Sequence, residues 1–152
     1  MDRQDKRILD IIQRDCTVAT AAIAERIGLS TTPCWRRIQN LEKEGVIAGR
    51  VALLDRSQLN LPVDVFVAIR TRQHSAEWLR TFAQAAVDLP EVVELYRMSG
   101  DIDYLMRVVV PDIAAYDNFY QRLISRVEIS DVSSSFAMER MKYTTALPLD
   151  YI

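Results

Sequence analysis

Polar and basic side chains gather in residues 23–47, where a short amphipathic helix pattern is followed by a turn and a second helix pattern. Gly28 supplies the backbone freedom for an abrupt helix stop. Ser30 is a favourable residue for starting the next helix, and Pro33 is tolerated in its first turn. The second helix is expected over residues 31–44. This helix-turn-helix outline is typical of a module that reads DNA.

The second helix of this pair has one apolar and one polar face. Cys34, Ile38 and Leu41 follow the helical repeat and form its expected buried stripe. Hydroxyls and amides on the opposite face can reach base edges, and Arg36 and Arg37 offer guanine or phosphate contacts. The candidate DNA-binding residues are Ser30, Thr31, Thr32, Pro33, Trp35, Arg36, Arg37, Gln39 and Lys43.

The alternative is the solvated face of an ordinary core helix, and the upstream sequence favours the DNA-reading interpretation. A further helix is expected over residues 3–14, with a capping pair of Asp2 and Asp5 at its start. Its buried face consists of Ile8, Leu9 and Ile12. Three helices within the first fifty residues predict a tri-helical, winged-helix-like domain.

Charge is distributed unevenly along the 152 residues. The chain carries a net charge of −2 with a pI near 5.4. Residues 1–50 hold nine Lys and Arg against seven Asp and Glu, whereas the remainder holds ten against fourteen. Between Arg26 and Arg50 the balance is five against two. Positive charge is thus concentrated around the expected recognition helix, and dimerisation would double it.

Composition indicates a folded protein without a membrane anchor. Hydrophobic residues make up 49% of the chain, which argues against disorder. There is no run of eighteen apolar residues and no secretory leader, so a cytoplasmic protein without membrane association is expected. Cys16 and Cys34 lack metal-site and redox-motif spacing. No metal or cofactor is therefore expected.

After residue 49 the pattern changes, and residues 50–61 are interpreted as a short extended piece and connector. Alternating apolar residues then predict a strand that begins near residue 62. The later elements are expected as a helix at 75–88, strands at 92–99 and 104–110, a helix at 112–126 and a strand at 129–141. This order defines a ferredoxin-like βαββαβ arrangement, so the fold class is α+β. The predicted segments are a DNA-binding domain at 1–49, a connector at 50–61, a ligand-binding and dimerisation domain at 62–141, and a tail at 142–152.

The predicted sheet is apolar on both faces. Phe66 and Ala68 alternate with Val65 and Val67, and the strand at 104–110 shows the same property. A sheet with only one covered face should be polar on the other. A second subunit is therefore expected to cover that face and form a dimer.

Matches in both domains resemble the Lrp/AsnC family of transcription regulators, also called feast/famine regulators. They are Asp5, Ile8 and Leu9; AERIGLSTTPCWRR from Ala24 to Arg37; Leu41, Gly45, Val46 and Ile47; Tyr96 and SGDIDY from Ser99 to Tyr104; Ser133 to Ser135; and Lys142, Leu147 and Pro148. The resemblance covers essentially the whole chain. Thr17 and Ala19 depart from it, and Thr17 or Thr20 is expected to cap the second helix.

The resemblance implies a sequence-specific DNA-binding regulator of amino-acid metabolism, with a small effector, typically an amino acid, held between dimers that assemble into tetramers or octamers. Backbone amides at Gly100 could receive a carboxylate, and Asp101 or Asp103 could pair with an α-ammonium group. The candidate effector-binding residues are Tyr96, Met98, Ser99, Gly100, Asp101, Asp103, Tyr104 and Ser134. The alternative is that the GDID segment only forms a hairpin turn.

The two other candidate classes of function are a small ferredoxin-like enzyme and an amino-acid-sensing subunit. His74 is the sole histidine, so a histidine-based metal site or catalytic relay cannot be assembled within one subunit. The chain also lacks a phosphate-binding glycine loop and a G-x-S-x-G turn, which argues against a small ferredoxin-like enzyme. An amino-acid-sensing subunit without a DNA role would leave the first domain unexplained.

Overall fold

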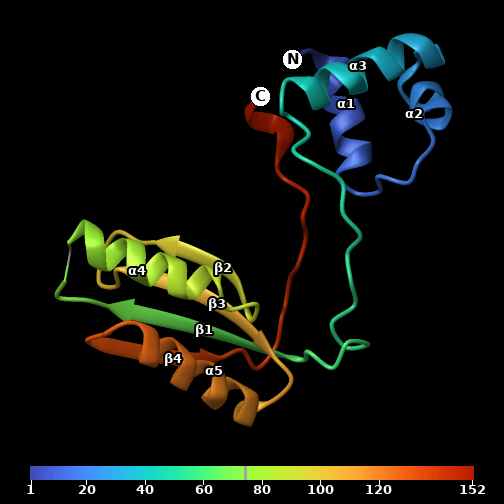
Figure 1. The fold of residues 1–152 in the computed structure, drawn as a ribbon. Coiled ribbons are helices and arrows are strands. Elements are labelled where there is room, and N and C mark those ends of the chain that lie inside the picture. Colours follow the sequence, from blue (N-terminus) through green and yellow to red (C-terminus); the bar gives the residue numbers. More distant parts are fainter. Residues whose placement is uncertain (74) are drawn as a thin grey trace. The chain divides into compact units, whose positions relative to one another are not determined.

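The computed structural model describes residues 1–73 and 75–152, and the chain divides into two compact units. The first unit, which we call the head, comprises residues 1–53 and 141–152. The second, which we call the sheet domain, comprises residues 54–140. Figure 1 shows both units as ribbons. His74 lies outside the described residues.

The head contains α1 (Arg3–Ile12), α2 (Thr20–Ile27) and α3 (Thr31–Lys43). Their apolar stripes meet in one core, formed by Ile8, Leu9, Ile12, Ile23, Ala24, Ile27, Cys34, Ile38 and Leu41. The predicted capping pair at the start of α1 is confirmed. The Asp2 carboxylate accepts hydrogen bonds from the backbone amides of Gln4 and Asp5, while the Asp5 carboxylate accepts from the Asp2 amide.

The turn between α2 and α3 requires a glycine. Gly28 has φ +74°, the left-handed conformation that ends α2, and Leu29 N donates to the Ala24 carbonyl at 2.9 Å. The expected cap of α2 by a threonine is wrong. Ala19 is the N-cap residue without a side-chain hydrogen bond, and the Thr17 hydroxyl donates to Asp15 instead.

The sheet domain follows the predicted βαββαβ order. Its elements are β1 (Val63–Arg70), α4 (Ala76–Val87), β2 (Val92–Arg97), β3 (Tyr104–Val110), α5 (Ile113–Arg126) and β4 (Asp131–Phe136). The strands form one antiparallel sheet in the order β2-β3-β1-β4. The ferredoxin-like arrangement is thereby confirmed, with the two long strands β1 and β3 at its centre.

Both helices of this domain cover the same face of the sheet, as Figure 1 shows. Val65, Val67 and Ile69 alternate along β1 and are fully buried against α4 and α5. In α5, Phe119 is fully buried against the sheet, whereas Ile113 is 70% exposed. Among the described residues, no helix covers the opposite face of the sheet, which we call the outer face.

The outer face is apolar at its centre and charged at one end. Phe66 remains 40% exposed there, whereas Val109 is buried. Asp64 lies beside them and is only 8% exposed. Its carboxylate accepts hydrogen bonds from Arg56 and from Arg107, the latter at 2.9 Å. Burial alone would raise the pKa of Asp64, but these two guanidinium groups outweigh it and hold the pKa below its usual value.

Two segments differ from the sequence-based expectation. The last strand ends at Phe136 rather than near residue 141, and residues 141–152 belong to the head. No strand forms in residues 50–61, where residues 56–60 make turns instead. Arg56 stabilises these turns by donating two hydrogen bonds to the Leu61 carbonyl.

Candidate DNA-binding and effector sites

The polar face of α3 is exposed to solvent. Cys34, Ile38 and Leu41 are at most 3% exposed, and their burial turns the opposite side of the helix outward. The exposed candidates on this side are Ser30, Thr31, Thr32, Pro33, Trp35, Arg36, Gln39 and Lys43. The Trp35 ring is 52% exposed, which is unusual for so large an apolar side chain.

The cations on this face differ in their partners. Among the described residues, the side chains of Arg36 and Lys43 form no hydrogen bond or ion pair. Gln39 donates to the Glu42 carboxylate at 3.0 Å, and Glu42 also pairs with Arg50. Arg36 and Lys43 are therefore the two positive groups of α3 that are available to an external anion.

Arg37 lies in a different environment from Arg36. Its Nη1 donates to the Asp2 carboxylate at 2.7 Å and to the Asp5 carboxylate at 2.8 Å. The hydrogen bond that Arg37 donates to Asp5, and then the one that it donates to Asp2, raise the pKa of Arg37. The structure thus places Arg37 against α1, apart from the exposed face on which it was grouped from sequence.

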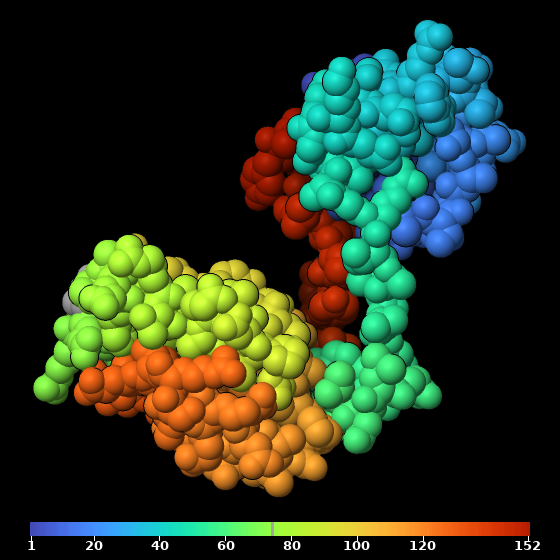
Figure 2. Space-filling view, in the orientation of Figure 1, coloured from blue at the N-terminus to red at the C-terminus, as the bar shows by residue number. Residues whose placement is uncertain are grey.

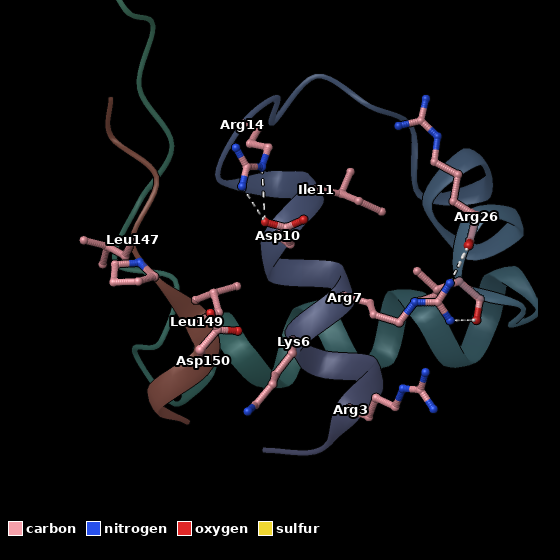
Figure 3. Close-up of a pocket in the computed structure, with 12 residues that line it drawn as sticks. Arg3, Lys6, Arg7, Asp10, Ile11, Arg14, Arg26, Leu147, Leu149 and Asp150 are labelled. Atoms are coloured by element: carbon pink, nitrogen blue, oxygen red, sulfur yellow. Dashed lines mark hydrogen bonds and ion pairs between the residues drawn. The ribbon is translucent and has the colours of Figure 1, made fainter. Parts of the chain in front are cut away.

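A hollow of about 500 Å³ lies along α1, on the side away from its buried stripe (Figure 3). Arg3, Lys6 and Arg7 line it from α1, together with Arg14 just after α1 and Arg26 at the end of α2. Arg7 is already engaged, since it donates to the backbone carbonyls of Arg26 and Ile27 at 2.8 and 2.9 Å. These bonds satisfy carbonyls that the end of α2 leaves unpaired.

The C-terminal residues form the other side of this hollow, a feature that sequence reasoning missed. Gln13 donates to the Leu147 carbonyl at 3.2 Å and accepts from the Leu147 amide at 2.8 Å. Leu149 packs against the core of the head. Figure 2 shows these C-terminal residues in red against the helices of the head. The apolar Leu-Pro-Leu run was the available signal, but it does not identify its distant partner.

The turn between β2 and β3 is fixed to the end of β1. Gly100 has φ +116°, which only glycine adopts readily. Asp103 bonds through its side chain and its backbone: one carboxylate oxygen accepts from Thr71 N at 2.8 Å, its amide donates to the Ile69 carbonyl, and its carbonyl accepts from the Met98 amide. Asp101 is exposed, and among the described residues its carboxylate has no partner, although its carbonyl accepts from Arg70. The two aspartates therefore differ in environment: Asp103 holds the end of β1, whereas the exposed Asp101 carboxylate has no partner among the described residues.

The candidate effector-binding side chains are divided between two faces of the sheet. Tyr96 and Met98 are 51% and 39% exposed. Tyr104 is buried in the core, with its ring centroid 4.8 Å from that of Phe82. Ser99 is exposed beside Gly100, whereas the Ser134 hydroxyl contacts the Tyr116 hydroxyl on the helix-covered side. Tyr104 and Ser134 therefore lie apart from the exposed turn.

A second hollow, of about 660 Å³, lies next to this turn. It is lined by Arg70, Thr71, Arg72, Gln73, Glu128, Ser130 and Asp131. Arg70 connects the hollow to the turn, because it pairs with Asp131 at 3.2 Å and donates to the Asp101 carbonyl at 2.7 Å. Both signs of charge thus line a hollow that adjoins the candidate effector turn.

Comparison with known proteins agrees in both units. Residues 1–48 match the winged helix-turn-helix DNA-binding family, and residues 64–147 match the Lrp/AsnC ligand binding domain family. The chain belongs to the Lrp/AsnC family. It is a DNA-binding transcription regulator with an amino-acid-responsive ligand-binding domain, and it is not an enzyme.

Lrp/AsnC relatives match along the whole chain. The DNA-binding transcriptional activator DecR of Escherichia coli K12 is 48% identical over 151 residues, covering 99% of both chains. A crystal structure of an AsnC family regulator from Agrobacterium tumefaciens is 64% identical with a TM-score of 0.97, covering 100% of this chain and 99% of the other. A regulator from Neisseria meningitidis, solved as a complex with L-Met, is 30% identical with a TM-score of 0.95, covering 99% and 98%.

In the part of the chain that the structure describes, no helix is both long and apolar enough to cross a membrane. Residues 1–73 and 75–152 likewise contain no group of three or more His, Cys, Asp or Glu side chains that could hold a metal ion.

Proposed function

We propose that α3 is the recognition helix and that Arg36 and Lys43 are its principal cationic contacts to DNA. The observation that carries this proposal is an exposed polar helix face whose two cations have no partner among the described residues. Thr31, Thr32 and Gln39 are placed to reach base edges, while Ser30, Pro33 and Trp35 border the same surface. Arg37 takes no direct part, because Asp2 and Asp5 already bind its guanidinium.

The salt dependence of DNA affinity tests this assignment. If Arg36 reads a guanine, Arg36→Ala should weaken specific binding by about 1–3 kcal/mol and relax specificity at one base. If it contacts a phosphate, the slope of log affinity against log salt should fall by roughly 0.9. Arg80→Ala is the control, because Arg80 is an exposed arginine of α4 in the sheet domain. Wild-type affinity and salt slope for the Arg36 variant would contradict the assignment.

We further propose that a free amino acid binds at the β2–β3 turn. The Asp101 carboxylate pairs with the α-ammonium group, and the backbone amides around Gly100 receive the α-carboxylate. Tyr96, Met98 and Ser99 are the exposed neighbours that contact the rest of the ligand. The L-Met complex of the Neisseria relative supports this ligand class.

Calorimetric titration with each of the twenty amino acids tests the effector site. Asp101→Asn should abolish the response with little change in thermal stability. Asp103→Asn is the matched comparison, and it should lower thermal stability because its carboxylate holds Thr71. An unchanged response in the Asp101 variant would assign the segment to a purely structural turn.

The outer face of the sheet is our proposed homodimer interface, and such dimers assemble into tetramers or octamers in the cytoplasm. Phe66 and Tyr96 are large exposed side chains on this uncovered face. Phe66→Asp should reduce the mass in light scattering to that of the 17.4 kDa chain. Ile113→Asp places the same charge on α5, at a residue that is 70% exposed against 40% for Phe66, and should leave the assembly intact.

A further inference from the structure

The start of α1 and the middle of α3 are joined by a single guanidinium nitrogen. Arg37 Nη1 lies 2.7 Å from Asp2 Oδ2 and 2.8 Å from Asp5 Oδ1. The other carboxylate oxygens form the helix cap: Asp2 Oδ1 accepts from two backbone amides, and Asp5 Oδ2 accepts from the Asp2 amide. Each carboxylate thus uses one oxygen to start α1 and the other to hold α3.

This arrangement is partly shielded from solvent. The shielding is on the Asp5 side: Asp5 is 15% and Arg37 33% exposed, whereas Asp2 is 53% exposed, similar to Asp10 in the exposed Asp10–Arg14 pair, whose side chains are 54% and 64% exposed. Shielded, charge-assisted hydrogen bonds are stronger and more directional than exposed ion pairs. The Asp2–Asp5–Arg37 group, which we call the clamp, can therefore fix one helix relative to the other.

We propose that Arg37 is a positioning residue, which together with Asp5 sets the orientation of α3 and thereby the fidelity of base readout. Arg36 and Arg37 are adjacent, yet only Arg37 turns toward α1. The clamp holds the turn of α3 that follows Thr31 and Thr32, so loosening it displaces the side chains that reach base edges. The positive charge of Arg37 is balanced by the carboxylates of Asp2 and Asp5 and adds little to the attraction of DNA phosphates.

This inference rests on the proposed function, in which α3 is the recognition helix. The experiment therefore tests the positioning role of Arg37 separately from the recognition-helix assignment. The full-length protein is used with a duplex selected from a random library by the wild type, and with a scrambled duplex of equal length. Variants are Arg37→Ala, Asp5→Asn and their combination. Arg36→Ala is the control for the arginine, and Asp10→Asn on the opposite side of α1 is the control for the carboxylate. Asp5→Asn is isosteric, which keeps the test valid if Arg37→Ala folds poorly.

Arg37→Ala and Asp5→Asn should each lower the ratio of selected to scrambled affinity by about tenfold, the size of one lost base contact. The affinity ratio of the double variant should be no lower than that of either single variant, because each single substitution already removes the same clamp. The salt slope should stay at the wild-type value, while Asp10→Asn leaves the ratio unchanged. This pattern would not follow from a loss of stability alone, since binding is measured well below the unfolding temperature.

Three results would overturn the inference. A salt slope lower by roughly 0.9 in Arg37→Ala but not in Asp5→Asn would make Arg37 a direct phosphate contact. An unchanged affinity ratio in both variants, despite a lower unfolding temperature, would make the clamp purely structural. If Arg36→Ala also left affinity and slope unchanged, the assignment of α3 as the recognition helix would fail first, and this inference with it.

Discussion

Replacing Asp64 with Asn should strongly destabilise the sheet domain. Asp64 is 8% exposed and lies between two guanidinium groups, those of Arg56 and Arg107. Arg107 also pairs with Glu94, so the change interrupts a chain of four charged side chains on the outer face. Asn has almost the same shape as Asp, so the effect measures the loss of charge and of one acceptor oxygen.

The magnitude follows from the contacts. A hydrogen bond to a charged group contributes about 1.5–3 kcal/mol, and removing one partner of a buried ion pair costs about 3–5 kcal/mol. Arg56 keeps the Leu61 carbonyl and Arg107 keeps Glu94, which limits the loss to roughly 2–4 kcal/mol. For a unit of this size each kcal/mol lowers the unfolding temperature by about 4–8 °C. The expected decrease is thus about 8–32 °C.

Differential scanning calorimetry at fixed protein concentration measures this change, because oligomerisation would otherwise shift the transition. Asp131→Asn is the matched control. It removes the same charge from an ion pair with Arg70 whose two side chains are each 57% exposed, and it should cost less than about 1 kcal/mol. Equal unfolding temperatures for the two variants would refute the reasoning, as would a decrease of under about 2 °C for Asp64→Asn.

The same carboxylate predicts the sign of one pH effect. The pKa of Asp64 is lower in the folded protein than in the unfolded chain. Its contribution to stability is therefore complete above the unfolded-state value, near 3.8, and is lost as pH falls through the folded-state pKa. The wild type should lose this increment in acid, while Asp64→Asn should lack it. A stability difference between the two proteins that persists below both pKa values would contradict this linkage.

Three other predictions concern the tail, the thiols and the effector turn. Deleting residues 147–152 should increase hydrogen exchange in α1, measured by mass spectrometry, while exchange in the sheet domain stays unchanged. Cys34 should react with iodoacetamide far more slowly than Cys16 in the native protein, because burial shields the thiol and raises its pKa, and the two rates should converge in urea. Gly100→Ala should lower the unfolding temperature because φ is +116°, whereas Gly49→Ala, which meets no atom within 4 Å, should have little effect.

Local patterns predicted most of the fold. The capping pair at Asp2, the stop at Gly28 and the apolar stripe of α3 each involve residues within a few positions of one another, so the sequence displays them directly. The end of β4 was missed for a different reason. Phe136 pairs with Val65, and the Ala137 amide donates to the Asp64 carbonyl. Because β1 begins at Val63, β4 has almost no partner strand beyond this point. Apolar residues such as Met138 continue beyond it, although that side chain is 97% exposed.

The candidate sites depended more on distant contacts. Whether Arg37 faces DNA or α1 is decided by carboxylates more than thirty positions away, which helical periodicity cannot reveal. The burial of Tyr104 could have been predicted from sequence, because Tyr104 points to the same face of β3 as the core residues Met106 and Val108. The sequence could not distinguish Asp101 from Asp103, because the residue that bonds the Asp103 carboxylate is Thr71, just after β1 and thirty-two positions away.

Two segments of the chain connect the sheet domain to the head, and an effector bound to the sheet domain can change DNA affinity through either one. One route is the connector at residues 50–61, and the other leaves β4 at Phe136 and ends where Gln13 holds Leu147. The candidate turn is bonded to the end of β1, which pairs with β4. A coupling of about 1–3 kcal/mol changes DNA affinity by about 5- to 150-fold, far below the roughly 10⁴-fold preference that a complete switch requires. A single ligand per chain therefore suits a graded response, and a sharp switch needs several chains that change together.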